Sequence, residues 1–195
     1  MKPIWFGGSF NPIHQAHLIC SRAAAEAGGF DRVILVPAAQ PPHKPQDTAL
    51  ASPRDRLRMC QLAVDGSELF RVDDLELKRT DPSYTIDTAA ALKAKGWHRI
   101  TWLIGADMLL YLPKWHEVDR LMREIDFVVM ARPGWGIDWQ SLPPEFRRLE
   151  KNVVQTPMID ISATDIRARV AAGLSIEYLT PPSVVRYIHD RGLYR

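Results

Sequence analysis

Short apolar segments of strand length alternate with longer helical patterns along this chain, and this alternation constrains the fold more than any other feature. Residues 33–36, for example, form an apolar run bounded by Arg32 and Pro37. The expected strands are 3–6, 32–36, 70–77, 100–104, 127–130 and 153–155. Strands separated by helical segments are typical of a parallel sheet with right-handed crossovers.

Helix start and stop signals occupy the segments between these strands. The first helix is expected to begin near His14 and to end at Gly28 and Gly29, and the second to begin at the Ser52-Pro53 cap. Further helical segments are expected at 85–95, 108–112, 117–123, 163–172 and 180–192, with a long surface loop at 133–144. The expected fold class is α/β, a Rossmann-like doubly wound parallel sheet with helices on both faces and a small C-terminal helical portion.

Length and composition bound the remaining possibilities. The 195 residues fit one domain, with an expected core at 1–161 and a helical portion at 162–195. With 46% apolar and 25% charged residues, the chain is globular, and no apolar run approaches the ~18 residues that span a bilayer. The N-terminus lacks a secretory signal, and Cys20 and Cys60 have no metal-ligand spacing, so a cytoplasmic protein with reduced thiols is expected. A net charge of +2 does not indicate a nucleic-acid partner.

A glycine turn with two histidines follows the first expected strand. Residues 7–17 read GGSFNPIHQAH, so His14 and His17 lie three residues apart in the first turn of a helix. Ligands of open α/β sheets bind outside the carboxyl ends of strands, and helix starts favour phosphate. Two such histidines are usually solvated or structural. Half of a zinc site is another interpretation, but no second pair of ligands is evident. The position behind two glycines favours phosphate binding, whereas the absence of GxGxxG removes the main support for hydride chemistry.

A second segment with phosphate-binding chemistry lies near the C-terminus. Residues 160–167 read DISATDIR, which places Ser162 and Thr164 at a strand-to-helix junction and Arg167 one turn into the helix. Hydroxyl groups there cap the helix, and a guanidinium can hold two phosphate oxygens at once. An ordinary capped helix with a surface arginine is an equally good interpretation of this segment alone.

Three further segments resemble substrate-binding elements. They are PAAQPPHK at 37–44, which presents His43 and Lys44, PSYTIDT at 82–88, and GADMLLYLPKW at 105–115. Taken singly, Trp115 is more often a packing residue, and Lys44 is usually a solvated charge. The helix start near Thr85 is suited to a carboxylate because its backbone N–H groups are not used within the helix.

Together these segments resemble the nicotinate-mononucleotide adenylyltransferases nearly from end to end. Residues 7–17 are similar to the nucleotidyltransferase signature GxFxPxHxGH, with Ala16 in place of the usual glycine. The segment around Ser162 is similar to ISSTxIR, with Ala163 in place of a serine, and LTPPSVVRYIHDRGLY is similar to the family's C-terminal ending. His116 stands where a tyrosine is frequent.

The resemblance implies AMP transfer from ATP to nicotinate mononucleotide, giving nicotinate adenine dinucleotide and pyrophosphate. It implies the following ATP-binding residues: Gly7, Gly8, Ser9, Phe10, His14, His17, Gly105, Asp107, Ser162, Thr164 and Arg167. It implies the following nicotinate-nucleotide-binding residues: Lys44, Tyr84, Thr85, Trp115 and His116. The implied catalytic residues are His14, His17, Lys44 and Arg167, and Mg²⁺ is expected to bind through the ATP phosphates without a protein metal site.

Two other classes of function stay open at this point. The first is an adenylyltransferase for nicotinamide mononucleotide or phosphopantetheine on the same scaffold, of which the PSYT and PKW segments disfavour the latter. The second is a non-catalytic nucleotide-binding sensor, which the combination of both histidines with Lys44 and Arg167 disfavours. The sequence leaves the oligomeric state open.

Overall fold

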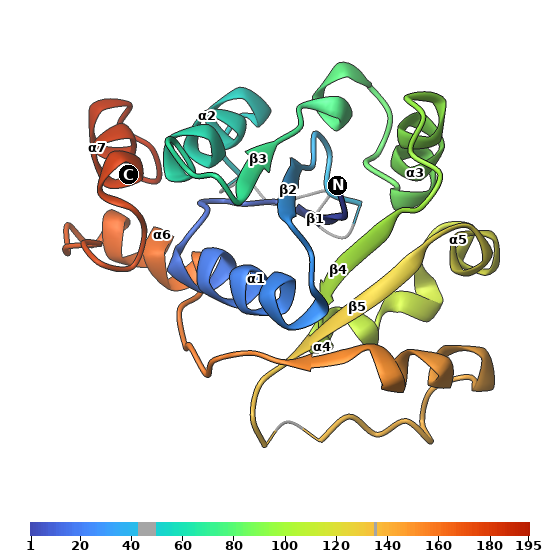
Figure 1. The fold of residues 1–195 in the computed structure, drawn as a ribbon. Coiled ribbons are helices and arrows are strands. Elements are labelled where there is room, and N and C mark those ends of the chain that lie inside the picture. Colours follow the sequence, from blue (N-terminus) through green and yellow to red (C-terminus); the bar gives the residue numbers. More distant parts are fainter. Residues whose placement is uncertain (43–49, 135) are drawn as a thin grey trace.

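The computed structural model describes residues 1–42, 50–134 and 136–195, and it is built around a single six-stranded parallel sheet (Figure 1). The strands are β1 (Pro3–Gly8), β2 (Arg32–Pro37), β3 (Phe70–Val72), β4 (Thr101–Gly105), β5 (Asp126–Ala131) and β6 (Val153–Gln155). Their order in the sheet is β3-β2-β1-β4-β5-β6, and every neighbouring pair is parallel. The expected parallel sheet is confirmed.

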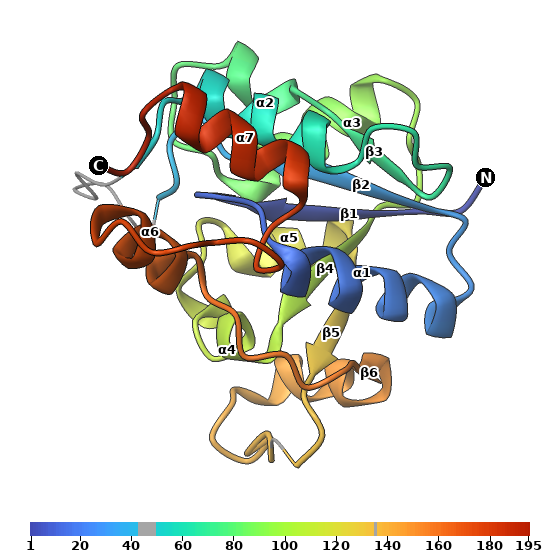
Figure 2. The ribbon, with the colours of Figure 1, turned by 90° about the vertical axis from the view of Figure 1, so that its left-hand side faces the viewer.

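Helices cover both faces of this sheet, as expected for a doubly wound fold (Figures 1 and 2). The α-helices are α1 (Gln15–Gly28), α2 (Pro53–Ala63), α3 (Thr85–Ala94), α4 (Ala106–Leu109), α5 (Val118–Glu124), α6 (Ala163–Ala171) and α7 (Pro182–Asp190). The 3₁₀ helices are η1 (Leu75–Lys78), η2 (Leu112–Lys114) and η3 (Pro144–Asn152). No helix of the described ranges is long and apolar enough to cross a membrane.

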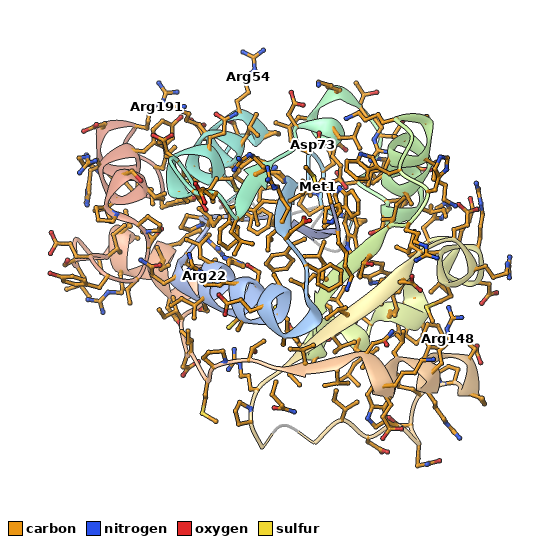
Figure 3. All side chains as sticks on the ribbon, viewed as in Figure 1. Met1, Arg22, Arg54, Asp73, Arg148 and Arg191 are labelled. Atoms are coloured by element: carbon orange, nitrogen blue, oxygen red, sulfur yellow. The ribbon has the colours of Figure 1, made fainter. Side chains whose placement is uncertain are left out.

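Two hydrophobic clusters, one on each face, hold these layers together. In β1, Ile4 and Phe6 belong to the cluster under α1, α2, α6 and α7, whereas Trp5 belongs to the cluster under α3, α4 and α5. Alternate residues of a strand point to opposite faces, so a strand buried on both faces reads as a continuous apolar run. Side chains fill the space between the layers, while Arg54 and Arg191 point outward (Figure 3).

The sheet topology places a ligand-binding crevice between β1 and β4. The chain passes from β1 to β2 and β3 on one side, then crosses to β4, β5 and β6 on the other side. Crossover connections therefore leave the carboxyl ends of β1 and β4 in opposite directions, which opens a crevice above them. Gly7 and Gly8 end β1 there, and Gly105 ends β4.

The C-terminal helices pack beside the start of α1 (Figure 2). The amide of Gln15 donates to the carbonyl of Leu179 at 2.9 Å, and the Thr180 hydroxyl donates to the carbonyl of Ile13 at 2.6 Å. The Tyr194 hydroxyl donates to Asn11 Oδ1 at 2.7 Å. Residues near the C-terminus are thus bonded directly to the turn that carries the two histidines.

Two expected strands, 70–77 and 3–6, differ from the structure by more than one residue, and one helical segment was not expected. The expected strand 70–77 ends at Val72, because Asp73 Oδ1 accepts a hydrogen bond from the amide of Leu75 at 2.9 Å and turns the chain into η1. The first strand extends past residue 6 through Gly8, since Gly7 and Gly8 pair with Val36 and Pro37. The 3₁₀ helix η3 follows the expected surface loop and buries Phe146, and it was not expected from the sequence.

Candidate functional site

Two adjoining cavities occupy the crevice at the carboxyl ends of β1 and β4. The first cavity has a volume of about 520 Å³ and extends toward the start of α3, and the second has a volume of about 360 Å³ and extends toward the start of α1. Both are lined by Phe6, Gly7, Gly8, Gly105 and Met108. A ligand that fills both cavities would therefore cross the glycines that end β1.

The second cavity is lined by the two histidines. His14 is the N-cap of α1, and its backbone amide donates to Nδ1 of His17 at 3.2 Å. The two rings stack with centroids 3.6 Å apart, and the His17 ring packs edge-on against Phe10 at 5.1 Å. Because His17 Nδ1 accepts this bond, the neutral ring carries its proton on Nε2, which makes Nε2 a donor. The expected histidine pair is thus assembled on one wall of a cavity.

Burial controls the protonation of His14. The side chain is buried, and desolvation lowers the pKa of His14 from 6.5 to about 4. His14 is therefore neutral at physiological pH in the unliganded protein. It can take part in phosphate binding as a hydrogen-bond donor, without a permanent charge.

This burial predicts an acid-sensitive contribution to stability. Because the pKa of His14 is lower in the folded state, the unfolded chain binds a proton first, so stability is full above pH 6.5 and is lost as the pH falls toward 4. Between pH 7.5 and 4.5 the loss from this group should be about 2.5 kcal/mol. In urea titrations at both pH values, His14→Gln should lose correspondingly less stability than the wild type, and His98→Gln should match the wild type. An equal loss in His14→Gln would contradict the buried neutral imidazole.

The glycine turn owes its shape to packing as well as to ligand access. A Cβ atom at Gly7 would collide with the ring of Trp102, so glycine is needed at this strand position. Phe10 has a φ of 45°, and its buried side chain packs beneath the turn and stabilises it. Arg56, which is fully buried, donates to the carbonyls of Ser9 at 2.7 Å and Ala39 at 3.1 Å. The turn after β1 is therefore fixed against the segment that follows β2.

The first cavity brings together four residues of the expected pyridine-nucleotide site. Tyr84 is the N-cap of α3, Thr85 is its first residue, and Trp115 and His116 follow η2. All four line this cavity, and the rings of Tyr84 and His116 stack with centroids 4.3 Å apart. Trp115 packs edge-on against Phe127 at 6.4 Å. An aromatic wall thus lies beside a helix N-terminus.

Other expected site residues lie elsewhere. Ser162 caps α6 by accepting from the amide of Asp165 at 3.0 Å, and neither it nor Thr164 lines the two cavities. Arg167 also lies outside the cavity linings, and its Nη1 donates to the carbonyl of Asn11 at 2.9 Å, in the histidine turn. Lys44 falls outside the described residues, as does His43.

Several cavity residues were not anticipated from the sequence. Ser83, Glu76 and Lys114 line the first cavity, and Arg132 and Thr156 line the second. Arg132 directly follows β5, so the rule that ligands bind at carboxyl ends of strands could have identified it. Glu76 was not identified as a site residue from the sequence, because it fell inside the expected strand 70–77.

Acidic residues of the described ranges do not form a metal centre. No group of three or more His, Cys, Asp or Glu in residues 1–42, 50–134 and 136–195 could hold a metal ion. Asp107, at the start of α4, contributes a carboxylate to the wall of the second cavity. A single carboxylate fits a hard cation that enters the site already bound to oxygen atoms of a ligand or of water.

Comparisons with known proteins identify the family. Residues 5–169 match the cytidylyltransferase-like family model. The chain is 42% identical to a probable nicotinate-nucleotide adenylyltransferase of Pectobacterium atrosepticum, with 98% of this chain and 97% of the relative covered. It is 40% identical to one of Herpetosiphon aurantiacus, with 96% of each covered.

Solved structures show the same fold. Plasmodium falciparum nicotinic acid mononucleotide adenylyltransferase complexed with NaAD superposes with a TM-score of 0.76 at 19% identity, covering 100% of this chain and 98% of that one. The same enzyme complexed with APC gives a TM-score of 0.74. With its parallel sheet, its histidine turn and its full-length relatives, the chain belongs to the nicotinate-nucleotide adenylyltransferases of the cytidylyltransferase-like family.

Proposed function

We propose that this chain transfers AMP from ATP to nicotinate mononucleotide, producing nicotinate adenine dinucleotide and pyrophosphate in NAD biosynthesis. The observation that carries the proposal is the pair of adjoining cavities with different chemistry. One has two imidazoles at a helix start, and the other has an aromatic wall beside a second helix start. ATP fits the second cavity and the pyridine nucleotide fits the first, so the reacting phosphates meet above Gly7 and Gly8.

The reaction in this site is a direct displacement at phosphorus. A phosphate oxygen of nicotinate mononucleotide attacks the α-phosphorus of ATP, and the bond to the β-phosphate oxygen breaks as pyrophosphate leaves. The nucleophile is already anionic, so the protein supplies alignment and charge stabilisation instead of a general base. His17 Nε2–H and the neutral His14 donate to phosphate oxygens as negative charge develops.

Cationic and hydroxyl groups complete the proposed phosphate site. Lys44 neutralises the incoming nucleotide phosphate, and Arg167, with Ser162 or Thr164, holds the pyrophosphate. Arg167 is already bonded to the histidine turn through Asn11, which brings α6 to the edge of the ATP site. We propose that 1–195 acts as one nucleotidyltransferase domain in which 162–195 completes this site.

A divalent cation is expected to accompany the nucleotide, and we propose Mg²⁺. When bound with the nucleotide, it would supply charge neutralisation at the phosphates. Asp107 is the carboxylate of the second cavity that would approach it. The cytoplasmic location expected from cysteine usage stays a prediction.

A substrate panel tests the proposed function. Pyrophosphate release is measured with ATP and, in turn, nicotinate mononucleotide, nicotinamide mononucleotide and phosphopantetheine. Release with nicotinate mononucleotide and formation of the acid dinucleotide are expected. Tight ATP binding without release in any reaction would favour the non-catalytic sensor.

Arg167 provides a specific prediction for the ATP site. If its guanidinium holds pyrophosphate oxygens as a fork, Arg167→Lys should raise the KM for ATP about tenfold, because lysine cannot form a bidentate pair. Arg169→Lys, on the same helix, is the matched control, since Arg169 donates to the carbonyl of Ser175 at 2.8 Å, away from the histidine turn. Unchanged ATP kinetics in Arg167→Lys would assign Arg167 a purely structural role in holding Asn11.

A further inference from the structure

Glu76 is a buried carboxylate in the wall of the first cavity, and the proposed transfer does not use it. It lies in η1, and its carboxylate contacts α3 through Thr88. The Thr88 hydroxyl donates to Glu76 Oε1 at 2.6 Å, and the Ser83 hydroxyl also bonds to this carboxylate. Burial raises the pKa of Glu76 to about 7, although these hydrogen bonds and the nearby Arg79 and Arg56 oppose the increase.

Both hydroxyls that contact Glu76 also accept a hydrogen bond from an N–H group. Ser83 Oγ accepts from the amide of Gln40 at 3.2 Å, and Thr88 Oγ1 accepts from Nη2 of Arg79 at 2.8 Å. A hydroxyl has one proton to donate, and the ionised carboxylate is the stronger acceptor: Thr88 Oγ1 lies 2.6 Å from Glu76 Oε1 and 3.3 Å from the carbonyl oxygen of Tyr84. Glu76 is therefore the acceptor at which two hydrogen-bond chains end.

These chains enclose the segment that begins α3. Ser83 precedes Tyr84 and Thr85, and Thr88 lies one turn further along the helix. The amide of Ser83 also donates to the carbonyl of Gln40 at 2.9 Å, so the start of α3 is bonded to the segment after β2. A change at Glu76 would therefore weaken the hydrogen bonds that hold this helix start.

We propose that Glu76 is a positioning residue for substrate selection, which holds Ser83 and Thr88 so that the start of α3 receives the carboxylate of the pyridine ring. The proposal rests on the proposed function, because it concerns the acid end of nicotinate mononucleotide. Glu76 acts through the helix start and not on the reacting phosphates. Its loss should therefore affect the pyridine nucleotide and leave ATP largely unaffected.

Glu76→Gln is the direct test. The amide keeps one acceptor oxygen and replaces the other with an NH₂ donor, so one of the two hydroxyls loses its acceptor. The KM for nicotinate mononucleotide should rise about tenfold, the KM for ATP should stay within about twofold, and the preference for the acid over the amide nucleotide should fall. Glu124→Gln is the matched control, because Glu124 accepts from Lys93 at 2.9 Å and lines neither cavity.

Ser83→Ala is a second variant that reaches the same network from its other end. It should raise the KM for nicotinate mononucleotide by about threefold to fivefold. The double variant should be no worse than Glu76→Gln alone, because the Ser83 chain acts through Glu76 and the two changes are therefore not additive. If Glu76→Gln does not fold, as judged by its melting temperature, Ser83→Ala decides the outcome. A KM for nicotinate mononucleotide that is unchanged in the folded variants, or a KM for ATP that rises equally, would overturn the proposal.

Wild-type measurements separate this proposal from the proposed function. Turnover of ATP with nicotinate mononucleotide is measured first, and binding of nicotinate mononucleotide alone is measured by calorimetry in the same variants. If the wild type turns over and the variants keep its KM for nicotinate mononucleotide, only the role of Glu76 is overturned. Binding without turnover would overturn the transfer reaction, and the variants' affinities would then decide the role of Glu76. An absence of wild-type binding would overturn both.

Discussion

Replacing His17 with alanine is expected to lower kcat by at least about 10²-fold, as loss of a preorganised charge-stabilising donor does in other enzymes. The amide of His14 orients the His17 ring through Nδ1, so Nε2–H is held in place before substrate arrives. Its contribution should therefore appear mainly in the transition state, and the affinity for ATP should fall much less. Single-turnover kinetics with saturating ATP measure the chemical step directly.

His98→Ala is the control for this experiment, because His98 is exposed and lines neither cavity. It should retain wild-type kcat. Near-normal turnover in His17→Ala would remove His17 from catalysis and leave it only the role of accepting the His14 amide. A raised KM for ATP with unchanged kcat would instead indicate that the histidine contributes uniform binding.

The second large effect concerns the acceptor: nicotinate mononucleotide should exceed nicotinamide mononucleotide in kcat/KM by about 10²–10³-fold. The backbone N–H groups at the start of α3 favour a carboxylate, whereas an amide would direct its own NH₂ donors at some of them. A charge-assisted hydrogen bond contributes about 1.5–3 kcal/mol, against about 1 for a neutral one. Two such bonds together with the donor–donor conflict of the amide give this range, at about 1.4 kcal/mol per tenfold.

Trp115→Ala separates stacking from charge recognition. Trp115 lines the first cavity, and its ring can stack on either pyridine base, so the variant should weaken both nucleotides to a similar extent. The ratio of the two kcat/KM values should then stay close to that of the wild type. Equal efficiency of the wild type on both nucleotides would identify an enzyme of dual or nicotinamide-directed specificity.

The sequence was sufficient to predict the architecture because the strands are buried on both faces. Continuous apolar runs such as 33–36 and 127–130 are typical of strands covered by helices on both sides, and the glycines after helices define the crossovers. The same reasoning predicted the wrong end for the strand expected at 70–77, because of a local side-chain hydrogen bond. Apolar and polar residues alternate there, but one hydrogen bond to Asp73 Oδ1 ends the strand at Val72 and buries Leu75 and Glu76 side by side.

The candidate site was predictable where its residues are adjacent in the chain. His14 and His17 lie at the start of α1, and Tyr84 and Thr85 lie at the start of α3. The helix starts expected from the sequence therefore located each pair. Glu76 reaches the first cavity only because the chain turns into η1 after Val72, which the alternating pattern at 70–77 does not indicate. Asn11 illustrates the same limit, because its side chain binds Tyr194 at the opposite end of the sequence.

The most direct test of the two-cavity assignment is a crystal structure of this chain with nicotinate adenine dinucleotide bound. The pyridine ring should lie beside Trp115 in the first cavity with its carboxylate at the amides of α3, and the adenylate should lie in the second cavity beside His14 and His17. The diphosphate should cross Gly7 and Gly8. A dinucleotide bound in the opposite direction, or outside these two cavities, would contradict the assignment.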